Sequence, residues 1–127
     1  MIIYRSHMKC SRVSLPSCHT LEPICVQLTT SGGPIVLLNL HRPGSVRPSA
    51  SFFDELSSVL EVLVTFSCKV LVGGDINIHV VEDTADVDAR RLYQLLTRFD
   101  TTQHVNSSLR RAVSSYPTQS VHSQLVA

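Results

Sequence analysis

Lys69-Val-Leu-Val-Gly-Gly-Asp-Ile-Asn-Ile-His79 is the stretch around which the rest of the sequence is organised. It opens with the apolar run 70–72, rich in β-branched residues, which predicts a short buried strand. The two glycines at 73 and 74 indicate a tight turn or a close approach by another part of the backbone. The stretch therefore predicts a core strand that ends in an unusual backbone conformation.

Three polar residues follow the glycines, and they alternate with apolar ones. Asp75, Asn77 and His79 would lie on one face if the backbone stays extended, with the isoleucines on the other. A carboxylate, an amide and an imidazole are costly to bury without a partner or a function. Two interpretations remain open from spacing alone. Polar caps on a strand-to-loop turn are the simpler one, and a chemical site is the other.

The same residues resemble a known family. Gly74-Asp-Ile-Asn-Ile-His79 is similar to the Gly-Asp-Phe-Asn motif of the endonuclease/exonuclease/phosphatase superfamily of divalent-metal phosphodiesterases. Upstream, Leu37-Leu-Asn-Leu-His-Arg-Pro-Gly44 resembles the family's Asn-Val-Tyr-Arg-Pro segment, and a Phe-Phe-Asp-Glu-Leu segment lies between the two. Leu95-Leu-x-x-Phe-Asp-x-x-Gln-His-Val105 follows at the corresponding place. The longer resemblance, over residues 2–105, is to the apurinic-type endonuclease domain of non-LTR (LINE-type) retrotransposons.

This resemblance implies an α/β fold, namely a partial endonuclease/exonuclease/phosphatase-type α/β sandwich with a mixed sheet and packed helices, truncated at both ends. Residues 1–105 would form the partial domain. Residues 106–127 resemble no part of the family in this reading frame, and we expect a disordered or frameshifted tail. A frameshift near Asn106 is the specific hypothesis, because a neighbouring frame of the codons for 106–108 can encode residues that family members carry there.

The resemblance also implies roles for individual residues. Asp75 would orient or deprotonate the attacking water and serve as a weak ligand for Mg²⁺ or Mn²⁺. Asn77 would bind the phosphate, and Arg42 would assist in substrate binding. His41 stands where the family has a tyrosine that polarises the phosphate, while His79 is expected to be structural.

The family's metal-binding glutamate and its closing Ser-Asp-His segment have no counterpart in this sequence. Glu22 is interpreted as a solvated carboxylate at the end of a strand and not as a replacement for that glutamate. About half of the family's site is therefore missing from the expected set.

The function implied is that of a target-nicking DNA endonuclease, present here as a weakly active or inactive fragment. The implied partners are DNA and the reverse transcriptase domain of a parent polyprotein, with a nuclear location if the chain is functional. A non-catalytic remnant or interaction scaffold is the main alternative. A phosphatase for a small phosphorylated ligand is a more remote one.

Composition is consistent with one globular domain. The 127 residues are 43% hydrophobic and 17% charged, which is enough apolar material for one core. A net charge of +1 provides no basic footprint, and this argues mildly against tight DNA binding by the chain alone. No apolar run is long enough to span a bilayer and no signal peptide is recognisable, so an intracellular protein is expected. The four cysteines, Cys10, Cys18, Cys25 and Cys68, lack zinc-type spacing and are expected to be reduced thiols.

Periodicity predicts the remaining elements. We expect short strands at 2–4 and within 7–16, and a hairpin of strands 24–28 and 35–40 turning at Gly32-Gly33. The second hairpin strand is nearly all apolar, so we expect both of its faces to be covered. Apolar residues spaced three and four apart predict a helix over 52–64, with Ser51 as N-cap and Asp54 and Glu55 as favourable charges. A second helix is expected at about 86–99, with Leu92, Leu95, Leu96 and Phe99 inward and Arg90, Arg91 and Arg98 outward.

Overall fold

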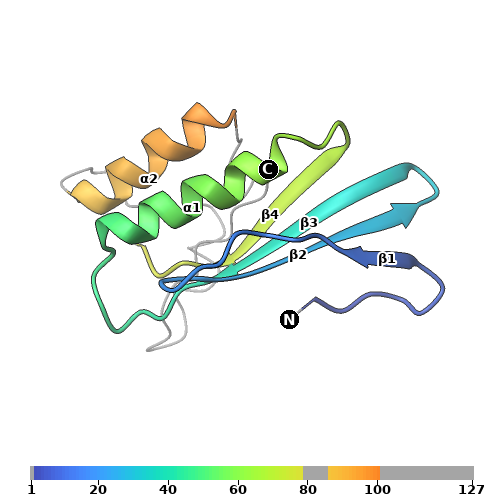
Figure 1. Ribbon diagram of the computed structural model, residues 1–127, viewed down its shortest axis with the longest axis horizontal. Helices are drawn as coiled ribbons and strands as arrows, with labels where there is room; N and C mark the ends of the chain where they lie inside the picture. Colours follow the sequence, from blue (N-terminus) through green and yellow to red (C-terminus); the bar gives the residue numbers. More distant parts are fainter. Residues whose placement is uncertain (1, 79–85, 101–127) are drawn as a thin grey trace, which may run out of the picture.

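The computed structural model describes residues 2–78 and 86–100, and within them the chain has an α/β fold (Figure 1). The elements in chain order are β1 Lys9–Arg12, β2 Glu22–Thr30, β3 Gly33–His41, α1 Ala50–Leu63, β4 Lys69–Asp75 and α2 Val87–Arg98. They form one mixed four-stranded sheet in the order β1-β2-β3-β4, with β4 parallel to β3 and the other pairs antiparallel. The predictions for His79 and for the tail after residue 105 lie outside the described residues.

The β2–β3 hairpin turns at the glycine pair, as predicted. Gly33 has φ +105°, a conformation that side-chain-bearing residues rarely adopt, and it is in register with Thr30. The Thr30 hydroxyl donates to the Gly33 carbonyl at 2.7 Å and accepts from the Gly32 N–H at 3.2 Å. These contacts fix the register of the two longest strands.

β3, α1 and β4 form a crossover unit, and its parallel strands approach closely at Gly74. This glycine has φ +132°, and a Cβ atom added to it would collide with the backbone of Leu40 on β3. The glycine in the Gly-Asp motif is therefore required by the contact between β3 and β4, not only by the turn that follows.

The core lies between the sheet and the helices, which both cover the same face (Figure 1). Val36, Leu38 and Leu40 alternate along β3 and are buried with Val72 of β4. They pack in one cluster with the apolar residues of the helices. Those residues are Phe52, Phe53, Leu56, Val59, Leu60 and Leu63 of α1 and Ala89 and Leu92 of α2. Leu95, Leu96 and Phe99 pack partly buried against this cluster, and the three arginines of α2 are exposed, so the predicted faces of the second helix are confirmed.

Three local expectations were wrong. The N-cap of α1 is Ser49, whose hydroxyl accepts from the Phe52 N–H at 3.2 Å, so the helix begins before Ser51. Residues 2–4 form no strand, and Ile3 is 82% exposed. The face of β3 that points away from the helices is only half-buried, since Ile35 and Leu37 have no second helix or strand layer above them among the described residues.

Glu55 has a different role from the expected helix-terminal charge. Its carboxylate accepts from the His19 N–H at 3.0 Å, from the Thr20 N–H at 2.9 Å and from the Thr20 hydroxyl at 2.6 Å. Burial by itself raises the pKa of Glu55, but these three hydrogen bonds outweigh it and hold the pKa below its ordinary value. Glu55 thereby ties the segment before β2 to helix α1.

The four cysteines are free thiols, as expected. Cys25 is buried in the core, and burial raises its pKa to about 11. No helix in the described part of the chain combines the length and the apolar character needed to cross a membrane.

Candidate active site

The candidate site lies where parallel strands β3 and β4 end. His41 and Asp75 are the last residues of these strands and are in register with each other. The carboxyl ends of adjacent parallel strands are the usual place for ligand binding in open α/β sheets. The fold thus brings together two residues that are far apart in the sequence and that the sequence predicted to act together.

Asn77 does not continue the extended backbone. β4 ends at Asp75, and Asn77 has φ +50°, the left-handed conformation that asparagine tolerates better than most residues. The Asp75 carboxylate accepts from the Asn77 N–H at 3.1 Å, which closes a turn of the Asx type. The expectation that Asp75 and Asn77 share one face of an extended strand is therefore wrong, because the turn breaks the alternation after Asp75.

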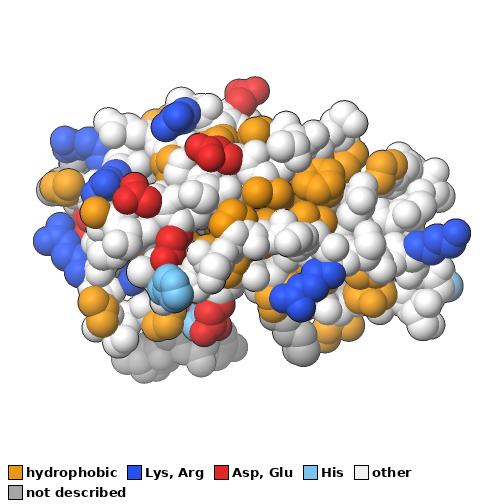
Figure 2. Space-filling view, viewed as in Figure 1, with side chains coloured by type: hydrophobic (Ala, Val, Ile, Leu, Met, Phe, Trp, Pro, Cys, Tyr) orange, Lys and Arg blue, Asp and Glu red, His pale blue; other side chains and the backbone are white. Residues whose placement is uncertain are grey.

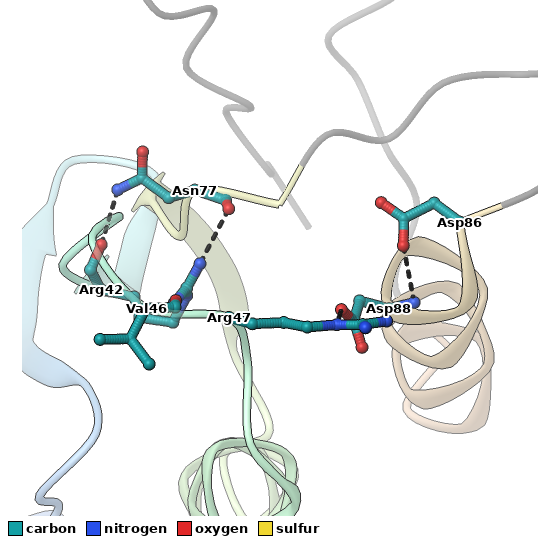
Figure 3. Close-up of polar contacts among 6 residues, drawn as sticks. All are labelled: Arg42, Val46, Arg47, Asn77, Asp86 and Asp88. Atoms are coloured by element: carbon teal, nitrogen blue, oxygen red, sulfur yellow. Dashed lines mark hydrogen bonds and ion pairs between the residues drawn. The ribbon is translucent and has the colours of Figure 1, made fainter.

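Arg42 is buried beside this turn, and its hydrogen bonds hold the turn in place. Only 5% of the residue is exposed. Its guanidinium donates to the carbonyl oxygens of Ile76 at 2.7 Å, Asn77 at 2.8 Å, Val46 at 2.6 Å and Pro43 at 3.2 Å. Its backbone N–H donates to the Asp75 carbonyl at 2.8 Å. Arg42 therefore joins the loop after β3 to the turn after β4 (Figure 3).

The charged guanidinium of Arg42 lies in a partly apolar environment. The guanidinium carbon lies 5.5 Å from the centre of the Phe52 ring, a cation–π distance. Burial lowers the pKa of Arg42, while the nearby carboxylates of Asp75 and Asp88 act in the opposite direction. A guanidinium remains protonated in proteins even so. Asp75 thus lies in the field of a fixed positive charge.

Asn77 is held from two further sides. Its side-chain Nδ2 donates to the Arg42 carbonyl at 2.6 Å. A Cβ atom on Gly44 would lie 2.8 Å from Asn77 Cγ, so only glycine leaves room for the amide in this position. The spacing of the two motifs indicated that these segments lie together, but not the geometry of the contact.

Arg47 connects the same loop to helix α2. Its Nε donates to the Asp88 carboxylate at 2.7 Å, and the Asp88 N–H donates to the carboxylate of the N-cap residue Asp86 at 2.9 Å (Figure 3). The loop that carries Arg42 and Gly44 is therefore anchored at both ends. No sequence pattern indicated Arg47 as a contact to α2.

The structure brings all four predicted site residues together, but it assigns two of them clear structural contacts. Four of the five N–H groups of the Arg42 guanidinium donate to backbone carbonyls. The guanidinium therefore has little donor capacity left for the predicted role in substrate binding. The Asn77 amide nitrogen also binds backbone. His41 is exposed, and its Nδ1 lies 3.2 Å from the Glu22 carboxylate. Sequence reasoning missed this contact, since the pairing of β2 with β3 creates it.

Comparison with known proteins gives only distant similarity. No protein-family model matches the sequence, and no curated protein matches it. A crystal structure of beta toxin from Staphylococcus aureus aligns with a TM-score of 0.43 and 10% identity, covering 82% of this chain and 41% of the toxin chain. A beta-hairpin deletion mutant of beta toxin from Staphylococcus aureus aligns with a TM-score of 0.42 and 13% identity, covering 83% and 41%. The chain thus spans about two-fifths of the length of these structures.

Proposed function

We propose that the chain is a fragment of a divalent-metal-dependent phosphodiesterase with the endonuclease/exonuclease/phosphatase type of sandwich, similar to the DNA-nicking domain of non-LTR retrotransposons. Of the two outcomes expected from the sequence, weak activity and no activity, we propose weak activity for this chain. The observation that carries the proposal is the register pairing of Asp75 with His41 at the carboxyl ends of β3 and β4. Asn77 and Arg42, the other residues of the two family-like motifs, lie next to this pair.

The side chains suit the parts of a phosphodiester hydrolysis. The Asp75 carboxylate can accept a proton from a water as that water attacks phosphorus and the bond to the leaving oxygen breaks. His41 and the Asn77 amide can donate hydrogen bonds to phosphate oxygens on which charge develops. The Asn77 amide nitrogen donates to the Arg42 carbonyl, so Asn77 would have to release or share that bond to contact a phosphate.

The implied Mg²⁺ or Mn²⁺ is not accounted for by the described residues. Within 2–78 and 86–100 no group of three His, Cys, Asp or Glu side chains could hold a metal ion. Asp75 is a single acidic ligand, and one of its oxygens accepts a hydrogen bond from the Asn77 N–H. The described residues do not fit a complete divalent-cation site, so further ligands would have to come from elsewhere.

DNA is the proposed substrate, with the reverse transcriptase domain of a parent polyprotein as a further partner and the nucleus as the place of action. These proposals rest on the resemblance of the two motifs. Figure 2 shows that charged side chains gather at the end of the molecule where α2 and the start of α1 lie, while hydrophobic ones gather over the middle. Positive and negative charges are interspersed at that end, so this view has no purely basic surface.

A non-catalytic interaction scaffold is the second candidate, and the open face of the sheet favours it. Val26, Leu37 and Leu71 form a row across β2, β3 and β4 on the side away from the helices, and each is only half-buried. Ile24 on the same face is 38% exposed. An apolar sheet face of this kind is typical of a surface that packs against another layer.

A plasmid-nicking assay separates the two candidates. Supercoiled plasmid is incubated with a high concentration of the chain, with magnesium or with a chelator, and the nicked form is quantified. The phosphodiesterase proposal predicts slow, magnesium-dependent nicking that Asp75→Ala abolishes. Asp54→Ala, a change of an exposed acid on α1, is the matched control and should leave the rate unchanged. Equal background in the wild type and Asp75→Ala would favour the scaffold.

A further inference from the structure

Glu22 and His41 form a cross-strand pair next to the candidate site. They are directly opposite each other in the antiparallel register of β2 and β3, so their side chains lie on the same face of the sheet. The carboxylate Oε2 of Glu22 lies 3.2 Å from Nδ1 of His41. His41 is in turn in register with Asp75, so the three residues form one row across three strands.

We propose that Glu22 is a positioning residue for His41. Nδ1 can contact a carboxylate favourably only when it carries a proton, so Glu22 selects the Nδ1–H tautomer of the neutral ring. The unprotonated Nε2 is then directed away from Glu22. This inference rests on the proposed function, because it assigns Nε2 the task of exchanging a proton or a hydrogen bond with an oxygen of a phosphodiester.

The surroundings of the pair fit a reactive ring and not a buried structural one. The side chains of His41 and Glu22 are 51% and 74% exposed, so a ligand at the end of the sheet can reach the imidazole. Among the described residues, the hydrogen bond of the His41 ring is the one from Nδ1 to Glu22, so Nε2 has no hydrogen-bond partner there. An exposed pair of this kind adds little to folding, so orientation of the ring is the main consequence of the contact.

The contact with Glu22 determines which ring nitrogen of His41 faces a ligand. A ring that rotates freely presents either nitrogen to a ligand, whereas a ring held at Nδ1 presents Nε2 alone. In the neutral state Nε2 accepts a proton, and in the imidazolium state it donates one, with the Glu22 contact intact in both. Asp75, which is next to His41 on β4, would keep its proposed role of accepting a proton from the attacking water.

The tautomer of His41 tests the proposal without any need for turnover. Long-range proton–nitrogen NMR spectra of the ¹⁵N-labelled chain, recorded where histidine is neutral, distinguish a protonated Nδ1 from a protonated Nε2. The His41 signals are assigned by their loss in His41→Gln. We expect the Nδ1–H form in the wild type and in Glu22→Gln, whose amide oxygen still accepts. Glu22→Leu should move the ring to the Nε2–H form that free histidine favours.

Glu61→Leu on α1 is the control, and it should leave the tautomer unchanged. The same tautomer in the wild type and in Glu22→Leu would overturn the proposal. In the nicking assay, Glu22→Leu should lower kcat by about tenfold or more with KM unchanged, since Glu22 acts through His41. An unchanged kcat in a nicking-competent chain would also overturn it. Absence of nicking in the wild type would count against the proposed function, whereas the NMR result still decides whether Glu22 positions His41.

Discussion

Arg42 and Asn77 hold each other by a reciprocal pair of hydrogen bonds. The guanidinium Nη2 donates to the Asn77 carbonyl at 2.8 Å, and the Asn77 side chain donates to the Arg42 carbonyl at 2.6 Å. The two residues are 35 positions apart, and each follows one of two adjacent parallel strands. The candidate site therefore depends on a buried arginine that fixes the turn carrying Asn77 against the end of β3.

Replacing this arginine should destabilise the whole fold. Arg42→Met retains much of the apolar stem but leaves four backbone carbonyls without their buried donor. We expect the free energy of unfolding to fall by about 3 kcal/mol, the range for orphaned buried polar groups. Urea denaturation followed by circular dichroism measures this change.

Arg47→Met is the matched control for that change. Arg47 lies five residues along the same loop but is exposed, and its guanidinium makes one ion pair, to Asp88. Its replacement should lower the denaturation midpoint far less than Arg42→Met does, because the Arg47 side chain is 74% exposed and solvent screens its ion pair on that side. Equal losses in Arg42→Met and Arg47→Met would contradict the structural role given to Arg42.

The two glycine positions Gly74 and Gly32 should respond very differently to alanine. At Gly74 an added methyl group would collide with the Leu40 backbone, and φ is +132°, so β4 would have to move away from β3. We expect Gly74→Ala to cost about 3 kcal/mol or more, or to prevent folding. At Gly32 the nearest atom to an added Cβ is the Thr30 hydroxyl at 3.8 Å, and Gly32→Ala should be nearly neutral. Thermal melts of both variants test this, and a normal melt for Gly74→Ala would refute the close approach of β3 and β4.

The contribution of Glu55 to stability should depend on pH in the acid range. Its pKa is lower in the folded chain than the ordinary value of 4.5, because of the hydrogen bonds from His19 and Thr20. A carboxylate with a lowered folded-state pKa stabilises the fold fully above its unfolded pKa, and this stabilisation is lost as the pH falls through the folded pKa.

Glu55→Ala therefore should be less stable than the wild type at neutral pH, with the difference shrinking below about pH 4.5. Denaturation midpoints of both proteins across pH 3 to 7 give the comparison. Asp54→Ala, the neighbouring exposed acid, should show no such convergence. A difference that grows on acidification would mean that Glu55 is not held as a carboxylate in the fold.

Sequence patterns were sufficient for the elements whose periodicity is strong and local. The Gly32-Gly33 turn, the apolar alternation of β3 and the helical spacing from Phe52 to Leu63 each have one dominant physical cause, and each was predicted. Residues 2–4 have an apolar run but no partner strand, so propensity alone was misleading there. The N-cap is Ser49 and not Ser51 because either of these nearby serines could supply the hydroxyl, and sequence does not show which one meets the Phe52 N–H.

The sequence predicted which residues lie at the candidate site, but not which contacts each of them makes. Motif resemblance selected His41, Arg42, Asp75 and Asn77, and these residues do lie together. The burial of Arg42 under four carbonyls and the left-handed conformation of Asn77 depend on contacts between segments far apart in sequence. The contact of Glu22 with His41 depends on strand register, which a single sequence does not reveal.

The most direct test of the central claim is the rate of magnesium-dependent plasmid nicking by Asp75→Asn compared with the wild type. Asparagine retains the oxygen that accepts from the Asn77 N–H, so the turn should survive while the carboxylate is lost, and a thermal melt checks that both proteins are folded. We expect weak nicking by the wild type and none by Asp75→Asn. Equal nicking by two equally folded proteins would contradict the claim that the carboxyl ends of β3 and β4 form a phosphodiesterase site.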